Sequence, residues 1–177
     1  MLVQGDLQGA RALFEKVLEI RQRTLSEDHR DLQTARGNLA LVLGDIGELK
    51  SARVLQEQVL EVFSKTLPDD HAFLQLARQG LAGTLKRLGD LRGARKLLES
   101  VLEVRSRTRP DEHYDLQVTR GNLASVCIQM NDIGRAAKLC RDLCRGVKVR
   151  LEKLEKLHSP RELEELAFGA ELATSKA

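Results

Sequence analysis

Three histidines, each directly after an acidic residue, are the first side chains of this 177-residue sequence that could do chemistry. His29, His71 and His113 stand 42 residues apart. An imidazole beside a carboxylate can bind a metal ion or act as a general base. Equivalent residues on stacked helices are about 8–10 Å apart or more, too far to share one ion. We therefore interpret the histidines as loop residues that begin the following helix, and expect neither metal nor cofactor.

The three cysteines could also bind a metal. Cys140 and Cys144 lie one helical turn apart and would point toward the helix that carries Cys127, but no fourth ligand is evident. Cysteine also packs well as a small core residue, and the odd number indicates free thiols in a reducing compartment. No phosphate-binding loop, nucleophile elbow or zinc-protease motif occurs. We expect no enzymatic activity.

Arginines recur at the same 42-residue step, and each follows a glutamate by 17 residues. An antiparallel helical hairpin would bring the two charges to the same height. We therefore predict ion pairs between the helices, with the arginine stems packed in the core. The alternative is an arginine ladder that binds an acidic peptide. The predicted structural pairs are Glu19–Arg36, Glu61–Arg78 and Glu103–Arg120.

The elements that position these residues are helices. The chain has 42 % apolar residues, only 3 % aromatic residues and three prolines. These values argue against a β-sandwich or β-barrel, since strands favour aromatic residues, and against disorder, since there is enough apolar surface for a core. The formal net charge of +3 is compatible with anionic partners without establishing them.

An internal repeat organises the helices. The segments GDLQGAR, GELKSAR and GDLRGAR begin at Gly5, Gly47 and Gly89. Apolar spacing predicts one helix over residues 31–46 and a second over residues 48–65 in the first full unit. A glycine-bearing break about every twenty residues excludes a continuous coiled coil. The sequence therefore predicts an all-α fold, a right-handed α-solenoid of tandem antiparallel helical hairpins.

These residues resemble a known family. The segment NLALVLGDIGELKSA, from Asn38 to Ala52, is similar to the tetratricopeptide repeat pattern, and the loop PDDH is similar to that of the 42-residue variety in kinesin light chains. The resemblance implies a half repeat over residues 1–29 and full repeats over about 30–71, 72–113 and 114–157. A C-terminal capping helix and tail would follow over residues 158–177.

The sequence departs from its own repeat in a few places. Gln56 replaces a bulky apolar residue, and Gly80 interrupts a column that otherwise holds asparagine. Beyond the last unit, Ser159 and Pro160 are typical of a helix start. They would open a short amphipathic helix through Leu163, Leu166, Ala167 and Ala170.

The resemblance also implies a function. Tetratricopeptide proteins are non-catalytic scaffolds that bind a peptide or helical segment of a partner on a concave face lined by the first helix of each repeat. We expect such a groove here, in a part of a larger signalling or regulatory protein. Asn38 and Asn122 match sites where the family holds a peptide backbone, although both could equally be solvated helix residues. The predicted groove contains Thr34, Gly37, Asn38, Leu41, Asp45, Gln79, Gly83, Lys86, Arg87, Gly121, Asn122, Ser125 and Gln129.

Two other functions are open. The chain begins inside a repeat, so an open apolar edge within residues 1–24 would favour a homodimer. The basic helix over residues 132–156 could contact nucleic acid, but it lacks aromatic stacking residues and contains acids. We expect no membrane partner, because the longest apolar run is too short to span a bilayer. Without a visible signal peptide, we expect a cytoplasmic protein.

Overall fold

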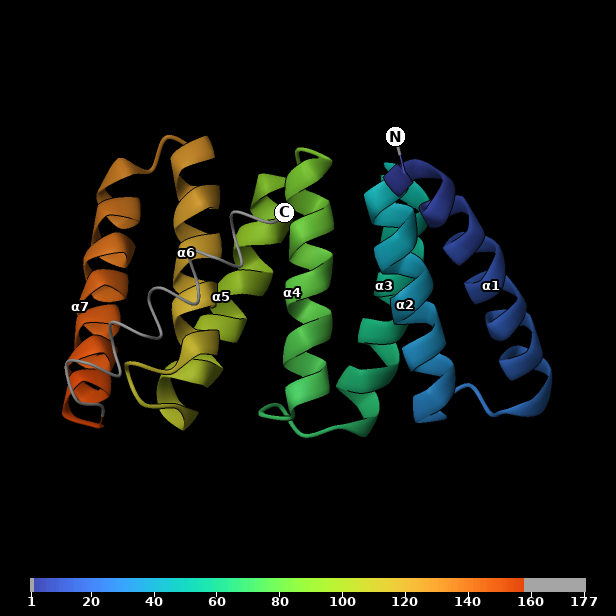
Figure 1. The fold of residues 1–177 in the computed structure, drawn as a ribbon, viewed down its shortest axis with the longest axis horizontal. Helices are drawn as coiled ribbons and strands as arrows, with labels where there is room; N and C mark the ends of the chain where they lie inside the picture. The colour runs from blue at the N-terminus through green and yellow to red at the C-terminus, as the bar shows by residue number, and fades with distance from the viewer. Residues whose placement is uncertain (1, 158–177) are drawn as a thin grey trace.

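The structure, a computed structural model, describes the backbone of residues 2–157 and the side chains of residues 7–155. Seven α-helices and no strands make up this part of the chain (Figure 1). The predicted capping helix at residues 158–177 lies outside the described residues. The helices are α1 (Leu2–Thr24), α2 (Arg30–Ile46), α3 (Leu49–Thr66), α4 (Ala72–Arg87), α5 (Leu91–Thr108), α6 (Tyr114–Gln129) and α7 (Ile133–Leu157).

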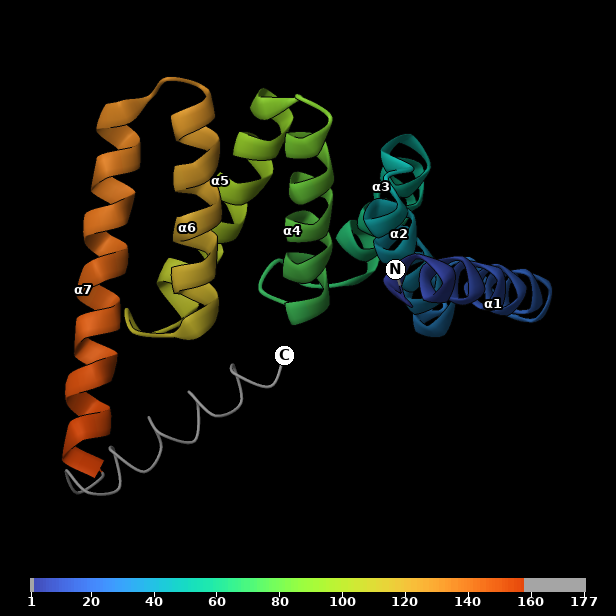
Figure 2. The same ribbon diagram turned by 45° about the horizontal axis from the view of Figure 1, so that its top comes forward.

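The helices form a row of antiparallel hairpins in which each helix packs mainly against the next one in the chain. The helices α2, α4 and α6 lie on one side of the array, with α3 and α5 behind them (Figures 1 and 2). Helix α2 also contacts α4, so the first helices of neighbouring repeats meet directly. The predicted all-α solenoid of helical hairpins is confirmed.

The repeated histidines begin the first helix of each hairpin. The Nδ1 atom of His29 accepts a hydrogen bond from the backbone N–H of Asp31 at 3.1 Å, and His71 and His113 make the equivalent bond at 3.2 Å. An N-cap side chain satisfies one of the free N–H groups at a helix start. The interpretation of the histidines as helix-initiating residues is therefore confirmed.

The same helices end on a left-handed residue. Gly47 and Gly89 have φ values of 97° and 83°, and Asn131 holds the equivalent place with φ of 60°. At the first of these ends the N–H of Glu48 donates to the carbonyl of Leu43 at 2.8 Å, and the N–H of Gly47 to that of Gly44 at 3.0 Å. This pair of bonds is the Schellman motif, and it recurs after α4 and α6. Asparagine tolerates the left-handed region, so the repeat over residues 114–157 keeps the turn without glycine.

The core follows the repeat. The leucine near the start of each first helix, Leu32, Leu74 and Leu116, is only 1 % exposed. The second helices contribute small residues to the same core clusters, and Ala52 and Ala94 are completely buried. Small side chains there let the two helices of a hairpin pack tightly.

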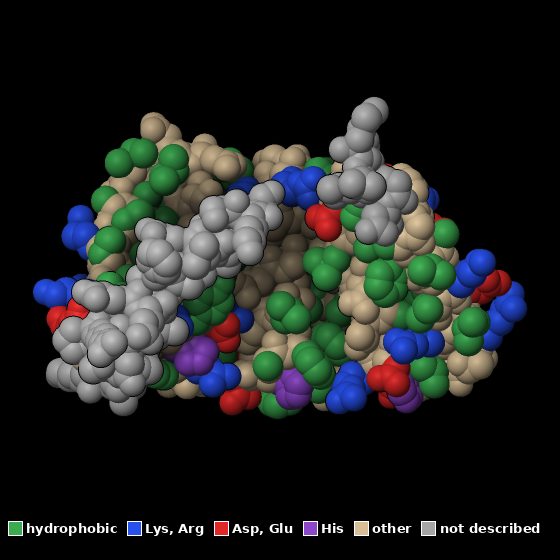
Figure 3. Space-filling model, viewed as in Figure 1, with side chains coloured by type: hydrophobic (Ala, Val, Ile, Leu, Met, Phe, Trp, Pro, Cys, Tyr) green, Lys and Arg blue, Asp and Glu red, His purple; other side chains and the backbone are tan. Residues whose placement is uncertain are grey.

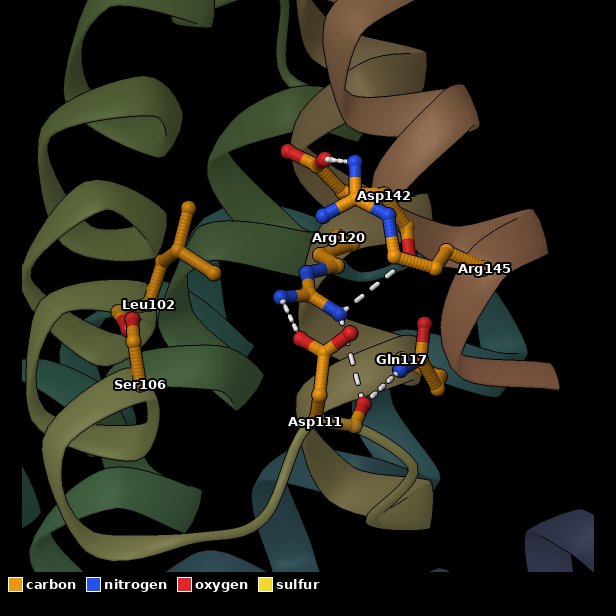
Figure 4. Close-up of polar contacts among 7 residues, drawn as sticks. All are labelled: Leu102, Ser106, Asp111, Gln117, Arg120, Asp142 and Arg145. Carbon is orange, nitrogen blue, oxygen red and sulfur yellow. Dashed lines mark hydrogen bonds and ion pairs between the residues drawn. The ribbon is translucent and has the colours of Figure 1, made fainter. Parts of the chain in front are cut away.

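Each repeated arginine is fixed by the loop that precedes its helix. The Arg36 guanidinium pairs with Glu27 at 2.7 Å, and Arg78 pairs with Asp69 at the same distance. In the third unit Arg120 pairs with the carboxylate of Asp111, and Gln117 donates to the Asp111 backbone carbonyl (Figure 4). Each loop carboxylate stands nine residues before its arginine, so the contact recurs with the repeat.

The predicted pairing of these arginines with second-helix glutamates was wrong. Glu19, Glu61 and Glu103 lie on the outer side of their helices, with side chains 60 %, 65 % and 72 % exposed. Each instead contacts a basic residue four positions later on its own helix. The spacing along the chain does not fix the rotation of a helix about its axis, and here that rotation turns the glutamates toward solvent.

The expected burial of the arginine stems is borne out, because Arg36 is 4 % exposed and Arg120 is 9 % exposed. All three arginines, Arg36, Arg78 and Arg120, are already paired with carboxylates of this chain. The geometry therefore favours a structural role for them over a ladder for an acidic peptide.

Candidate partner-binding groove

An apolar pocket of about 220 Å³ opens between α2, α3 and α4. Hydrophobic side chains gather on the face between α2 and α4 (Figure 3). Leu41 and Leu76 stand at this pocket with 61 % and 63 % of their surface exposed. We name this site the central pocket; its lining is Gln33, Thr34, Gly37, Asn38, Leu41, Gln56, Val59, Phe63, Phe73, Leu76, Ala77 and Gly80.

The central pocket is built where the chain departs from its own repeat. At five lining positions the residue is different from those found 42 positions before and after it, and at four of them, all but Leu76, the type of side chain also differs from both. These five departures are Gln56 in place of Phe14 and Leu98, Phe63 in place of Arg21 and Arg105, Phe73 in place of Asp31 and Asp115, Leu76 in place of Thr34 and Val118, and Gly80 in place of Asn38 and Asn122.

One pair of departures replaces a polar link with an aromatic one. Between α5 and α6, at the position equivalent to Phe63, the guanidinium of Arg105 donates to the Asp115 carbonyl at 2.9 Å and to the Thr119 hydroxyl at 2.7 Å. Between α3 and α4, Phe63 and Phe73 stack instead, with ring centroids 6.1 Å apart. A charged wall therefore becomes an apolar one.

A second pair of departures places an amide beside open space. Gln56 is only 8 % exposed, and its Oε1 atom is buried with no hydrogen-bond partner among the described residues. A Cβ atom added at Gly80 would lie 3.7 Å from the Gln56 Nε2 atom, an ordinary contact distance. The Oε1 atoms of Gln75 and Gln117 are likewise buried without a hydrogen-bond partner among the described residues, so this feature is not confined to the central pocket.

Basic side chains near the end of α4 reach the first helices of both neighbouring hairpins. The Lys86 ammonium donates to the Ser125 hydroxyl at 3.5 Å, a contact that links α4 to α6. A Cβ atom at Gly44 would meet the Arg87 guanidinium at 3.6 Å, so Arg87 reaches back to α2. Lys86 and Arg87 therefore connect α4 with α6 and with α2, beyond the lining of the central pocket.

The structure brings together part of the predicted groove. Four predicted residues of α2, Thr34, Gly37, Asn38 and Leu41, line the central pocket. Gly121 faces Leu143 of α7, because a Cβ added there would lie 3.5 Å from a Leu143 methyl carbon. The other predicted residues lie outside the pocket: Asp45, Gln79, Gly83, Lys86, Arg87, Asn122, Ser125 and Gln129.

The sequence analysis did not predict the side of the central pocket formed by α3, nor the lining residues of α4. Its only partial signals were the departures at Gln56 and Gly80, which were noted but not connected. Comparing every column of the repeat would have added Phe63, Phe73 and Leu76.

Other candidate sites are weaker. No group of three or more metal-binding side chains occurs within residues 2–157. Several basic residues of α7 are paired with acids, as in the contacts of Arg135 with Glu99 and Arg145 with Asp142, both at 2.9 Å. Over the same range, no helix combines the length and apolar character that a membrane crossing requires.

Comparisons with known proteins agree with the helical solenoid. Two family models, both described as tetratricopeptide repeat, match residues 2–65 and 76–115, which is more than half of the chain. No curated protein matches the sequence. A solved structure of kinesin light chain TPR-like repeats from Podosopora anserina is 26 % identical, with a TM-score of 0.77, and the match covers 88 % of this chain and 72 % of that one.

Two further solved structures share the fold at lower identity. BtubC (BKLC) from P. vanneervenii is 20 % identical with a TM-score of 0.76, and the match covers 82 % of this chain and 58 % of that one. The apo form of RapI is 15 % identical with a TM-score of 0.67, over 80 % of this chain and 38 % of that one. The chain is a tetratricopeptide repeat protein of the kinesin-light-chain type. Repeats of this family are in general non-catalytic scaffolds that bind protein partners.

Proposed function

We propose that the chain captures a segment of a partner protein in the groove formed by α2, α4 and α6, with a large apolar side chain of that segment in the central pocket. The observation that carries the proposal is the convergence of five departures from the repeat on one apolar pocket. Core packing alone gives no reason for departures at the groove, because the same positions in the flanking units fold equally well with other residues.

The chemistry of the pocket supports this use. Leu41, Leu76 and Phe73 expose apolar surface that a ligand would remove from water, at about 25 cal/mol per Å². Arg30 stands 5.9 Å from the centre of the Phe73 ring and adds a positive rim.

The test begins with a displayed library of random peptides selected against the intact chain. A selected peptide should lose about 30-fold in affinity for Leu76→Asp, as expected when a contact worth about 2 kcal/mol is removed. The matched control is Val54→Asp on α3, since Val54 is also an exposed apolar helix residue, at 54 %, but is not part of the pocket. Equal binding to both variants would refute the groove as the binding site.

Self-association through α1 is a second candidate function. Leu13 and Ile20 are 66 % and 61 % exposed on this helix, and Val17 between them is 37 % exposed. A sedimentation experiment decides the matter: an α1 dimer should dissociate in Ile20→Glu, and a wild-type chain that stays monomeric at high concentration rejects this candidate.

A further inference from the structure

The array has three joints, each between a second helix and the hairpin that follows it. We name the joint after α1 the first joint, the joint after α3 the middle joint and the joint after α5 the last joint. Because equivalent residues recur every 42 positions, the three joints can be compared contact by contact. The central pocket, between α2, α3 and α4, lies in the middle joint.

An ion pair crosses both the first and the last joint on the side of the second helices. Arg11 of α1 pairs with Glu48 at the start of α3, with nitrogen and oxygen 2.5 Å apart. Arg95 of α5 makes the equivalent pair with Asp132 at the start of α7, at 3.1 Å. Each pair ties a second helix to the second helix of the following hairpin.

A hydrogen bond to the backbone crosses the same two joints near the loops. The guanidinium of Arg21 in α1 donates to the Asp31 carbonyl of α2 at 2.6 Å. Arg105 of α5 makes the equivalent bond to the Asp115 carbonyl of α6 at 2.9 Å. The first and the last joint are therefore each fixed by polar links at two places.

The middle joint has neither link. The residues equivalent to the ion pair are Arg53 and Asp90, but Arg53 pairs with Glu57 on its own helix, at 2.7 Å. The residues equivalent to the backbone bond are Phe63 and Phe73, which stack with ring centroids 6.1 Å apart. Both polar links of the flanking joints are thus replaced in the middle joint.

The other contacts across the middle joint are also loose. Arg30 of α2 stands 5.9 Å from the centre of the Phe73 ring, and Arg87 of α4 lies beside Gly44 of α2. Among the described side chains, no hydrogen bond or ion pair joins α1–α3 to α4–α7. Hydrogen bonds are directional and apolar contacts are not, so the middle joint holds its two sides together without fixing their angle.

The buried core is divided at the same place. The cluster that contains Ala52 has all of its buried residues in α1–α3, and the cluster that contains Ala94 has all of them in α4–α7. Only Val59, Phe63 and Leu74 form a buried cluster across the middle joint. Figure 2 shows α4–α7 as one upright row, with α1 lying across that direction.

We propose that the middle joint is a hinge about which α1–α3 and α4–α7 move as two bodies. Phe63 and Phe73 line the central pocket from opposite sides of this joint, so the motion widens and narrows the pocket. Proteins that close around a ligand commonly hinge at the binding site. The hinge belongs to the free chain, so it stands whether or not a partner binds in the pocket.

The experiment measures distances between pairs of nitroxide labels by dipolar electron paramagnetic resonance. It uses the full chain with Cys140→Ser and Cys144→Ser. Cys127 takes up no label, because it is buried and burial raises the pKa of its thiol. Equivalent exposed positions of the second helices carry the labels. The pairs are Ala12→Cys with Val54→Cys for the first joint, Val54→Cys with Lys96→Cys for the middle joint, and Lys96→Cys with Lys138→Cys for the last joint.

The middle pair should give a distance distribution about twice as wide as either flanking pair, because only that joint turns. All labels stand on exposed helical positions of the same repeat column, so the freedom of the label itself contributes equally to the three widths.

A second variant supplies a link that the middle joint lacks. At the last joint Arg135 of α7 also pairs with Glu99 of α5, at 2.9 Å. The equivalent residues at the middle joint are Gly93 and Glu57. Gly93→Arg should therefore narrow the middle distribution to the width of the flanking ones. The matched control is Gly134→Arg in the first turn of α7, where nothing lies within 4 Å of an added Cβ atom, and it should leave the middle width unchanged.

The new arginine fits because the one group in its way is flexible. An added Cβ atom at Gly93 would approach the Asp90 carboxylate to 2.7 Å, and the end of that side chain can turn aside. In α7 the same arrangement already contains an arginine, since the N–H of Arg135 donates to the Asp132 carboxylate at 3.2 Å.

Three results would overturn the proposal. Equal widths at the three joints would show that the middle joint turns no more than the others. A middle distribution that stays wide in Gly93→Arg would show that the missing links are not what frees the joint. Narrowing of the same size in Gly134→Arg would show that an added arginine acts by some means other than a link across the joint.

Discussion

Filling the central pocket from within should stabilise the chain and abolish partner binding. The substitution is Gly80→Leu in α4. A Cβ atom at this position meets only Gln56 Nε2, at 3.7 Å, so the first atom of the new side chain fits without strain. The remaining carbons enter a space of about 220 Å³ that is lined mainly by apolar side chains.

The expected gain has two sources. Replacing glycine by leucine within a helix contributes about 0.7 kcal/mol from helix propensity. Burying part of a leucine side chain in a pocket open to solvent contributes about 1 kcal/mol, less than the 1.5–3 kcal/mol of full burial. A total near 2 kcal/mol should raise the melting temperature by about 4–8 °C for a chain of this size.

The assay pairs thermal unfolding, followed by circular dichroism, with affinity for a peptide selected against the wild type. The control Gly9→Leu lies on the exposed side of α1, with nothing within 4 Å of an added Cβ atom. It should gain only the propensity and keep its affinity. A Gly80→Leu variant that is less stable than the wild type, or that binds the peptide unchanged, would refute the argument.

The remaining predictions concern the loop contacts and a helix end. Glu27→Ala should lower the free energy of unfolding in urea by only about 1 kcal/mol, because Glu27 is exposed and water can replace it. Arg36→Ala should cost about 2–4 kcal/mol, because its buried stem leaves a cavity, and equal losses would contradict this. Hydrogen bonds from Arg36 and from Lys153 hold the pKa values of Glu27 and Glu112 below 4.5. Since the folded values are the lower ones, this stabilisation is present above the unfolded pKa and lost as the pH falls through the folded values. The melting temperature should therefore drop between about pH 5 and pH 3, and a flat profile would count against these contacts. Asn131→Gly should raise the free energy of unfolding by up to about 1 kcal/mol, since φ there is 60°, and a destabilised variant would show that the asparagine side chain is needed.

The 42-residue step was enough to predict the hairpins, because each feature that fixes a helix end recurs with it. His71 starts α4, and Gly89 closes the turn after it, as their equivalents do in the other units. Spacing also indicated that Arg36 would be buried. It could not indicate the partner of Arg36, because the choice between Glu19 and Glu27 depends on helix rotation and on the path of the loop.

The groove was harder to predict than the fold for a related reason. Residues repeated in every unit, such as Leu32 and Ala52, reflect packing that every hairpin needs. A binding site for one segment needs residues that occur once. Phe63 and Phe73 belong to different helices and are ten residues apart, so neither attracts notice by itself.

Positions that differ from their equivalents in the other repeats can therefore be divided into those that stand alone and those that lie together in the structure. Asn131 in place of glycine stays alone at a helix end and preserves the left-handed turn, so it carries no function of its own. Phe63, Phe73 and Gly80 converge from two helices on one pocket, and each removes a polar group that a flanking unit keeps. Independent drift would scatter such changes over the array, whereas a requirement for one apolar ligand places them together. Convergence in space, more than the presence of any single unusual residue, is therefore the argument for the proposed binding site in this solenoid.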